Sequence, residues 1–354
     1  MKSDNPFTLT FGRQPSTSIT RLEDINEIAE TFSSNKPVCQ TYLISGLRGS
    51  GKTVLMTSVV TNLQKKGNWI TVDLNSSVNL LEDFAMRLAD ACKKSTNLTE
   101  GGIDISLAGF GIGLSGAKME RDSVSKIESL LEYAKKKNKR VLITIDEVIP
   151  NESMKVFASQ FQIFVRKEYP VFLIMTGLYE NIFAIQNDSQ LTFLLRSPRI
   201  KLEPLSIQQI VNNYKRIFRV DEQTAIKFAS LTKGYALAFQ AFGYLYWDYR
   251  NELSFEDILV KFDELLGDFA YRKIWDSLSA TEKKIISFFS EKEKEKAMVK
   301  EIRDALSMTS AVFSKYREKL LNKGLLVAKE YGTLELTLPR LGRFAKFYLA
   351  YEEE

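Results

Sequence analysis

One short stretch of the chain constrains its fold and its chemistry more than any other. It reads Gly46-Leu47-Arg48-Gly49-Ser50-Gly51-Lys52-Thr53 and fits the pattern G-x-x-x-x-G-K-[ST]. The apolar run Tyr42-Leu43-Ile44 precedes it, and apolar residues at helical spacing follow from Val54, so the stretch joins a strand to a helix. In that setting the glycines let backbone N–H groups turn toward an anion at a helix N-terminus. The sequence therefore predicts a phosphate-binding loop, and its expected contact residues are Gly46, Leu47, Arg48, Gly49, Ser50, Gly51, Lys52, Thr53 and Val54.

The last two motif residues have distinct expected roles. The ammonium group of Lys52 would reach the β- and γ-phosphates of a nucleotide, and the hydroxyl of Thr53 would ligate Mg²⁺. A glycine-rich turn followed by a chance Lys-Thr pair is the alternative, but it does not explain the complete motif between a strand and a helix. We therefore expect ATP and ADP as ligands and Mg²⁺ as a cofactor.

The composition narrows the remaining chemistry. The 354-residue chain has no histidine, and its two cysteines, Cys39 and Cys92, are far apart. Cys/His zinc sites and histidine acid–base catalysis are thus excluded, so any general base must be a carboxylate. No apolar run approaches the ~20 residues of a membrane span, and the start lacks a signal-peptide core. We expect a cytoplasmic protein without membrane contact, whose net charge of +5 is compatible with a polyanionic partner.

Strand and helix patterns alternate through residues 1–203. After an amphipathic helical segment from Leu22 to Phe32 and the phosphate loop, apolar runs predict strands at Trp69–Leu74, 141–147 and Val171–Gly177, with a short final one near Ile200. This alternation predicts an α/β core with a five-stranded parallel sheet. Residues 101–116 alternate apolar and small residues, which favours an inserted β-hairpin over a second nucleotide motif.

Two carboxylates end the second of these apolar runs. Asp146 and Glu147 follow Val141-Leu142-Ile143-Thr144-Ile145, and ligands of an open parallel sheet bind at the carboxyl ends of its strands. Asp146 is suited to the Mg²⁺ shell, and Glu147 to polarising a water that attacks the γ-phosphate. Thr176 ends the next apolar strand, where its hydroxyl would position the water, although it could simply cap the strand.

Two arginines lie just before and at the final short strand. Arg196 and Arg199 belong to the run Leu195-Arg196-Ser197-Pro198-Arg199-Ile200. We expect them near the nucleotide edge, where one could stabilise a γ-phosphate in the same chain or in a neighbouring copy of a homo-oligomer. Ordinary surface arginines are the alternative, and the sequence does not choose between the two residues.

From Ser206 onward the strand signals cease. Ser206 with Gln209 forms a capping box that opens a helix, and further helices are expected from Asp221, over Tyr235–Tyr249 and over Ser254–Leu266. Residues 204–274 are therefore predicted to form a helical lid.

The last segment, 275–354, has the pattern of a winged helix-turn-helix. Ser279 to Glu282 caps a first helix, and two short helices, 299–306 and 310–322, follow a charged linker at 291–296. Apolar runs then flank Tyr331-Gly332 as a hairpin. Three helices followed by a hairpin describe this module.

The third helix of the module is the expected DNA reader. Val312, Tyr316 and Leu320 are expected to face inward, because they recur every four residues. The residues then left for DNA are Ser310, Ser314, Lys315, Arg317 and Lys319, with Lys329 in the hairpin. The same charges suit a merely solvated helix, and winged helices also dock proteins.

Taken together, these motifs resemble the AAA+ ATPases, nearest to STAND-type ATPases and archaeal and bacterial origin-recognition-like initiators. The resemblance rests on Gly46 to Thr53, Ile143 to Glu147, Thr176, the lid and the terminal winged helix. In such families a segment similar to the one from Asn5 to Arg21 wraps the adenine. Initiators carry a lid arginine after a turn, and STAND proteins a Gly-x-Pro, but the stretch from Thr232 to Ala238 has neither.

These predictions combine into one functional hypothesis. The chain is expected to be a Mg²⁺-dependent ATPase with a core at 1–203, a lid at 204–274 and a winged helix at 275–354, whose nucleotide state controls binding to double-stranded DNA or assembly. The alternative is a nucleotide-gated signalling or scaffold ATPase whose winged helix docks proteins.

Overall fold

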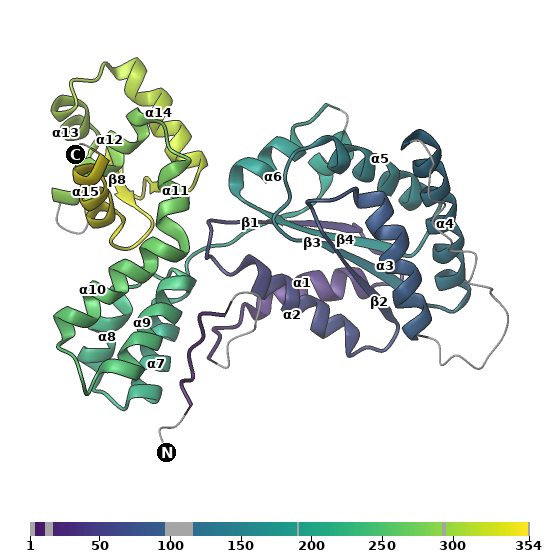
Figure 1. Ribbon diagram of the computed structural model, residues 1–354, viewed down its shortest axis with the longest axis horizontal. Coiled ribbons are helices and arrows are strands. Elements are labelled where there is room, and N and C mark those ends of the chain that lie inside the picture. The colour runs from purple at the N-terminus through teal and green to yellow at the C-terminus, as the bar shows by residue number, and fades with distance from the viewer. Residues whose placement is uncertain (1–3, 11–16, 96–115, 190, 292–294, 353–354) are drawn as a thin grey trace. The chain divides into compact units, whose positions relative to one another are not determined.

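The computed structural model describes residues 4–10, 17–95, 116–189, 191–291 and 295–352 (Figure 1). They form two compact units. One unit comprises Arg21–Ser45 and Lys52–Lys201, and the other comprises Met1–Thr20, Gly46–Gly51 and Leu202–Glu354. The predicted hairpin at 101–116 lies outside the described residues except for Gly116, at which helix α4 (Gly116–Lys136) begins.

The first unit is built on a five-stranded sheet in the order β2-β3-β4-β1-β5. Every pairing in this sheet is parallel, as the sequence predicts. Its strands are nearly continuous apolar runs because helices cover both faces of such a sheet. Their bounds are β1 (Thr41–Ser45), β2 (Trp69–Leu74), β3 (Arg140–Ile145), β4 (Val171–Gly177) and β5 (Arg199–Lys201).

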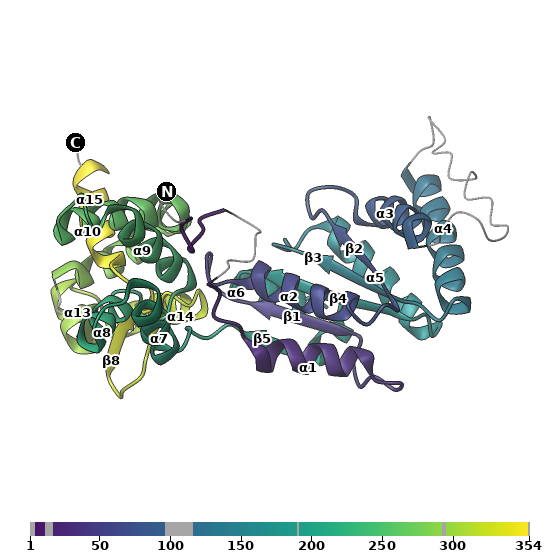
Figure 2. The ribbon, with the colours of Figure 1, turned by 90° about the horizontal axis from the view of Figure 1, so that it is seen from below.

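Alternate residues of the strands pack against different helices. On one face Phe32 of α1 (Leu22–Ser33) contacts the rings of Tyr42 and Phe172. On the other face Leu43, Ile143 and their neighbours pack with residues of the later helices. Both views show these helices around the sheet (Figures 1 and 2). The helices are α1, α2 (Lys52–Gln64), α3 (Leu80–Ser95), α4, α5 (Glu152–Arg166) and α6 (Tyr179–Gln186), with the 3₁₀ turn η2 (Thr192–Arg196).

Strand β4 lies between β1 and β3. The strand that leads into the phosphate loop is therefore not a neighbour of the strand that ends before Asp146. The register pairs Ile44 with Thr176 and Ile145 with Met175, so the carboxyl ends of the three strands finish at one level. The end of β4 is thus placed between the two motifs.

The second unit contains the predicted helical lid. Its helices are α7 (Ile207–Phe218), α8 (Glu222–Ser230), α9 (Ala236–Tyr249) and α10 (Phe255–Leu266). Polar caps begin three of them: the side chains of Ser206, Asp221 and Ser254 each accept a bond from a first-turn N–H group. Such caps satisfy donors that have no partner inside the helix, which is why these boundaries were readable from the sequence.

The same unit contains a small C-terminal domain with a three-stranded antiparallel sheet, order β6-β8-β7. This arrangement is consistent with a winged helix. The cap predicted at Ser279 to Glu282 begins its first helix and is a reciprocal capping box. The elements are α12 (Ala280–Phe288), the turn η4 (Phe289–Glu291), β6 (Lys296–Met298), α13 (Val299–Ala305), α14 (Ser310–Asn322), β7 (Leu326–Val327), β8 (Thr333–Leu336) and α15 (Leu341–Glu352).

Three features of this domain differ from the sequence-based expectations. The segment expected to be a charged linker ends in strand β6, which pairs with β8. Helix α15 was not anticipated. In α14 Leu320 is buried and Tyr316 is half-buried against the core, as expected, but Val312 is 45% exposed and its neighbour Phe313 is buried instead.

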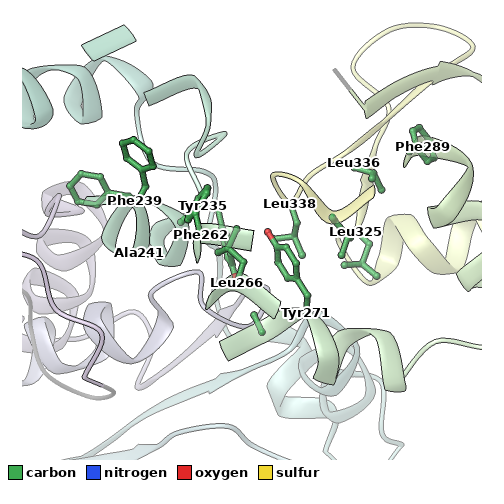
Figure 3. Packing of buried hydrophobic residues seen from close by; sticks show 14 of the residues in the cluster. Tyr235, Phe239, Ala241, Phe262, Leu266, Tyr271, Phe289, Leu325, Leu336 and Leu338 are labelled. Atoms are coloured by element: carbon green, nitrogen blue, oxygen red, sulfur yellow. The ribbon is translucent and has the colours of Figure 1, made fainter. Parts of the chain in front are cut away.

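The lid and the small domain share one hydrophobic cluster. The π-helical turn η3 (Gly267–Tyr271) and α11 (Arg272–Asp276) continue α10 without a break toward α12. Tyr271 lies between the lid residues and the residues of the small domain in Figure 3, and its hydroxyl donates to the carbonyl of Pro339 at 2.6 Å. The cluster therefore packs both parts as one body.

Candidate nucleotide site

The phosphate loop owes its shape to its glycines. Gly49 and Gly51 have φ angles of 74° and 94°, a left-handed conformation that side-chain-bearing residues rarely adopt. The N–H of Ser50 donates to the carbonyl of Leu47 at 3.2 Å, which closes a tight turn. Helix α2 then begins at Lys52, so the loop leads directly into a helix N-terminus. This is the backbone arrangement that favours a bound phosphate.

Two polar groups of the motif suit an anionic ligand. Lys52 is only 6% exposed, and a buried ammonium group requires negatively charged or strongly polar surroundings. The hydroxyl of Ser50 is buried and has no hydrogen-bond partner among the described residues. A buried donor without a partner is costly, so a phosphate oxygen would satisfy a need that the loop itself leaves open.

Two hydroxyl groups converge on the carboxylate of Asp146. The hydroxyl of Thr53, from the first turn of α2, donates to Asp146 Oδ2 at 2.7 Å. The hydroxyl of Thr176, from the end of β4, donates to Asp146 Oδ1. The structure therefore brings together Thr53, Asp146 and Thr176, which lie far apart in the sequence. A hydroxyl and a carboxylate are hard oxygen ligands of the kind that Mg²⁺ prefers.

Glu147 is held by its backbone while its side chain is exposed. Its N–H donates to Asp146 Oδ1 at 3.1 Å and lies 3.2 Å from the hydroxyl oxygen of Thr176. Its φ angle is 51°, and a left-handed conformation costs a non-glycine residue about 1–3 kcal/mol. Strain of this kind persists where neighbouring bonds enforce it and is typical of catalytic sites.

A residue that sequence reasoning missed fixes the segment after Glu147. The N–H of Val148 donates to the carbonyl of Thr176 at 2.8 Å, and the side-chain amide of Asn181 donates to the carbonyl of Val148 at 3.1 Å. Asn181 belongs to α6, and no local pattern in the sequence links it to β3. It secures the backbone on the far side of the strained residue.

The two candidate arginines do not join this cluster. Arg196 ends η2 and Arg199 begins β5, and both side chains are exposed. Among the described residues, neither guanidinium bonds to Thr53, Asp146 or Thr176. The register pairs Arg199 with Leu43 and Lys201 with Ser45, so Lys201 is the residue of β5 level with the start of the phosphate loop.

The N-terminal segment packs on the lid within its unit. The side-chain amide of Asn5 donates to the carbonyl of Tyr244 at 3.1 Å, and the N–H of Thr8 donates to the side-chain oxygen of Gln240 at 3.2 Å. Phe7 is buried against Gly243, where a Cβ atom would lie 2.4 Å from the ring. This segment is thus packed against α9.

The candidate DNA-binding residues lie on two elements of the small domain. Ser310, Ser314, Lys315 and Lys319 of α14 are exposed as expected. Arg317 is half-buried, and its Nε has no hydrogen-bond partner among the described residues. Lys329, beside the hairpin, is paired with Glu335 at 3.2 Å.

Residues 19–228, more than half of the chain, match the family described as an ATPase domain predominantly from Archaea. The chain belongs to this ATPase family. It is accordingly an ATP-binding P-loop ATPase of the AAA+-like kind, with the fold and the motifs described above. Residues 269–345 also match a domain of unknown function (DUF8462), which corresponds to the small C-terminal domain. No curated protein matches the chain.

Solved structures of archaeal proteins share the fold of this ATPase. The Walker-type ATPase PABY2304 of Pyrococcus abyssi is 15% identical with a TM-score of 0.65, and the match covers 93% of this chain and 96% of that one. The ORC2 protein of Aeropyrum pernix, in ADPNP–ADP complexes, is 14% identical with a TM-score of 0.64, and the match covers 97% of each chain. Within the described residues, none of the helices is long and apolar enough to cross a membrane.

Proposed function

We propose that this ATPase is Mg²⁺-dependent and that its nucleotide state controls the binding of double-stranded DNA by the winged helix. The observation that carries the catalytic part is the carboxylate of Asp146, which accepts bonds from Thr53 and Thr176 beside the strained Glu147. Because ATP is abundant inside cells, we expect this ATPase to work in the cytoplasm.

Each residue of the site has a role that its position supports. Thr53 and Asp146 would hold Mg²⁺, since their oxygens are adjacent and of the right chemical type. When bound, Mg²⁺ neutralises negative charge on the phosphates. Lys52 binds the β- and γ-phosphates. Glu147 accepts a proton from the attacking water, because its side chain is exposed while its backbone is fixed.

Thr176 positions Glu147 instead of contacting the reacting atoms. Its hydroxyl is fully buried and is engaged by both Asp146 and the N–H of Glu147. Arg196 and Arg199 remain candidates for γ-phosphate contacts across a homo-oligomer, and their exposure is compatible with that role. An interface between copies would be needed to bring either guanidinium to a phosphate.

The DNA-binding proposal rests on α14 as the reading helix of the winged helix. Its exposed Ser310, Ser314, Lys315 and Lys319 present hydroxyls and cations on one element. Helices of this kind enter the major groove, where such groups contact base edges and phosphates.

Two observations favour the alternative, a winged helix that docks a protein. Two lysines of the wing, the three-stranded sheet with its connecting loop, form ion pairs with carboxylates: Lys329 pairs with Glu335 at 3.2 Å, and Lys296 pairs with Glu330 at 2.8 Å. Tyr331 at the hairpin is fully exposed, and an exposed aromatic ring is typical of protein contact surfaces. The wing is thus less cationic than its lysines alone suggest.

The salt dependence of DNA binding separates the two functions. Replacing both Lys315 and Lys319 with alanine removes two potential phosphate neutralisations, which should reduce the slope of log affinity against log salt by nearly two units. The matched control is a Lys346→Ala variant, which removes an exposed cation from α15. Identical slopes for the wild type and the double variant would refute the reading-helix assignment and leave protein docking as the better account.

A further inference from the structure

The turn between α8 and α9, with the first two residues of α9, lacks the lid arginine that the resemblance to initiators leads one to expect. Its sequence, Thr232-Lys233-Gly234-Tyr235-Ala236-Leu237, has no arginine. In the structure its two ends make hydrogen bonds to different parts of the protein. One end contacts the phosphate loop, and the other contacts the winged helix, all within the second unit.

The phosphate-loop end consists of two hydrogen bonds to backbone carbonyls. The hydroxyl of Tyr235 donates to the carbonyl of Arg48, and the N–H of Leu237 donates to the carbonyl of Gly49 at 3.0 Å. The fit is close, since a Cβ atom on Gly49 would lie 2.4 Å from the Tyr235 hydroxyl oxygen. Two separate constraints therefore require glycine at position 49: its left-handed backbone and the close approach of Tyr235.

These bonds orient the donors of the loop. In a trans peptide the carbonyl and the N–H point in opposite directions, and the described residues contain no cis peptide. Holding the Arg48 carbonyl toward Tyr235 consequently points the N–H of Gly49 away from the lid. A phosphate loop functions through such N–H groups, so Tyr235 fixes a part of the loop that the nucleotide needs.

The turn itself is rigidly built. Lys233 and Gly234 have φ angles of 47° and 76°. The N–H of Leu205 donates to the carbonyl of Gly234 at 2.7 Å, and a Cβ atom on Gly234 would lie 2.5 Å from the Leu205 carbonyl oxygen. Tyr235 is 6% exposed, and burial raises the pKa of its phenol, so the hydroxyl stays protonated and donates. The two bonded ends are thus joined by a short turn that is fixed by its own hydrogen bond and packing.

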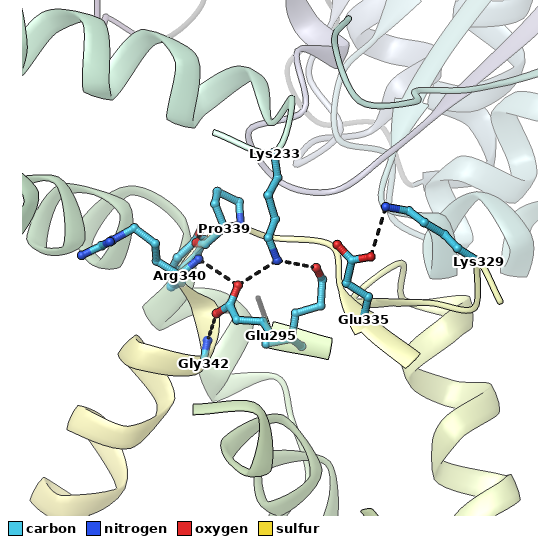
Figure 4. A network of polar contacts seen from close by, with 9 residues as sticks. Lys233, Glu295, Lys329, Glu335, Pro339, Arg340 and Gly342 are labelled. Atoms are coloured by element: carbon cyan, nitrogen blue, oxygen red, sulfur yellow. Dashed lines mark hydrogen bonds and ion pairs between the residues drawn. The ribbon is translucent and has the colours of Figure 1, made fainter. Parts of the chain in front are cut away.

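The winged-helix end is a partly buried polar network (Figure 4). The ammonium group of Lys233 donates to the carboxylate of Glu295 at 2.8 Å and to the carbonyl of Leu336 at 3.0 Å. The carboxylate of Glu295 also accepts from the N–H groups of Arg340 at 3.2 Å and Gly342 at 2.7 Å. The side chains of Lys233 and Glu295 are only 23% and 13% exposed, so solvent screens this pair less than a surface pair.

We propose that Tyr235 is a positioning residue for the phosphate loop and that Lys233 joins the same turn to the winged helix, in place of a charged lid residue that reads the γ-phosphate. This goes beyond the proposed control of DNA, because it requires only that the protein bind nucleotides. A residue that supports the loop differs from one that reads the γ-phosphate in its effect on ADP. The backbone N–H groups of the loop cradle the α- and β-phosphates, which ADP and ATP have in common, so the turn supports both nucleotides equally.

The first test is a Tyr235→Phe variant, which keeps the ring and removes the hydroxyl. We expect the affinities for ADP and for a non-hydrolysable ATP analogue, measured by calorimetry with Mg²⁺, to fall by the same factor of about five, the effect of one hydrogen bond. Tyr214→Phe is the matched control, because the Tyr214 hydroxyl donates to the carbonyl of Phe239 at 2.8 Å inside the same lid. Its nucleotide affinities should not change.

The results that overturn the positioning role are specific. Unchanged affinities in Tyr235→Phe, a loss confined to the ATP analogue, or an equal loss in Tyr214→Phe would each refute it. If the wild type bound neither nucleotide, the ATPase function itself would fail, and that outcome is distinct from the others.

The second test concerns the link to the winged helix. ADP should slow amide hydrogen exchange in β6 and β8 of the wild type, and Lys233→Met should abolish this slowing while leaving ADP affinity within about twofold of the wild-type value. Lys296→Met is the control, since Lys296 pairs with Glu330 in the same domain at 2.8 Å and does not touch the turn. If the slowing persists in Lys233→Met, or never occurs in the wild type, the link is refuted.

Discussion

Replacing Thr176 with valine tests how the site positions Glu147, the proposed general base. The substitution keeps the shape of a fully buried side chain and removes its hydroxyl. Two interactions are lost: the bond that Thr176 donates to the carboxylate of Asp146, and the contact with the N–H of Glu147. The strained backbone of Glu147 then keeps its bond to Asp146 but loses its contact with Thr176.

The expected cost follows from the kinds of bond removed. A hydrogen bond to a charged group contributes about 1.5–3 kcal/mol and a neutral one about 0.5–1.5 kcal/mol. Burying a methyl group in place of the hydroxyl returns about 0.8 kcal/mol. We therefore expect the free energy of unfolding to fall by about 2 kcal/mol. Because Glu147 loses an anchor, kcat should fall roughly 10- to 100-fold, while ATP affinity stays within about twofold of wild type.

A matched variant separates misplacement of Glu147 from simple destabilisation. Thr144 is buried on the neighbouring strand β3, and its hydroxyl donates to the carboxylate of Asp73. Thr144→Val should lower stability by about 1–2 kcal/mol without changing kcat, since Thr144 does not contact Glu147. Stability is measured by denaturant titration and kcat by phosphate release, at a temperature where every variant is folded. If Thr176→Val loses no more kcat than Thr144→Val does, the positioning role is wrong.

Three further predictions concern other parts of the chain. Lys52→Ala should abolish tight ATP binding, because it removes the main countercharge of the phosphates, and unchanged affinity by calorimetry would contradict the site assignment. Glu147→Gln should retain ATP and slow phosphate release at least 100-fold, an estimate for loss of a general base; wild-type turnover would show that the base lies elsewhere. Burial of Glu282 acts to raise its pKa, but bonds from Ser279 and Lys323 outweigh it and lower the pKa overall. Because the pKa of Glu282 is lower in the folded state, its ionised carboxylate stabilises the fold above the unfolded pKa of about 4.3, and this stabilisation is lost on acidification. Glu282→Gln should therefore be less stable than the wild type at neutral pH. Between pH 5 and 3 its free energy of unfolding, measured by denaturant titration, should fall less than that of the wild type.

The features that the sequence by itself determined are encoded by neighbouring residues. The phosphate loop is readable because its glycines, Lys52 and Thr53 are contiguous and lie between a strand pattern and a helix pattern. Helix starts at Asp221, Ser254 and Ser279 are readable because each cap bonds an N–H group three residues away. The parallel sheet follows from the alternation of β and α segments.

Only the tertiary structure decided which distant residues meet. The insertion of β4 between β1 and β3 brings Thr176 to Asp146, and no local pattern specifies that strand order. In α14 helical spacing correctly predicts that Leu320 is buried, but the contacts of the folded domain bury Phe313 and leave Val312 exposed. The bond from Tyr235 to Arg48 joins residues far apart in sequence, as does the pairing of Lys233 with Glu295. Such contacts depend on how the elements pack against one another, and the local sequence pattern of an element does not specify which other element it contacts.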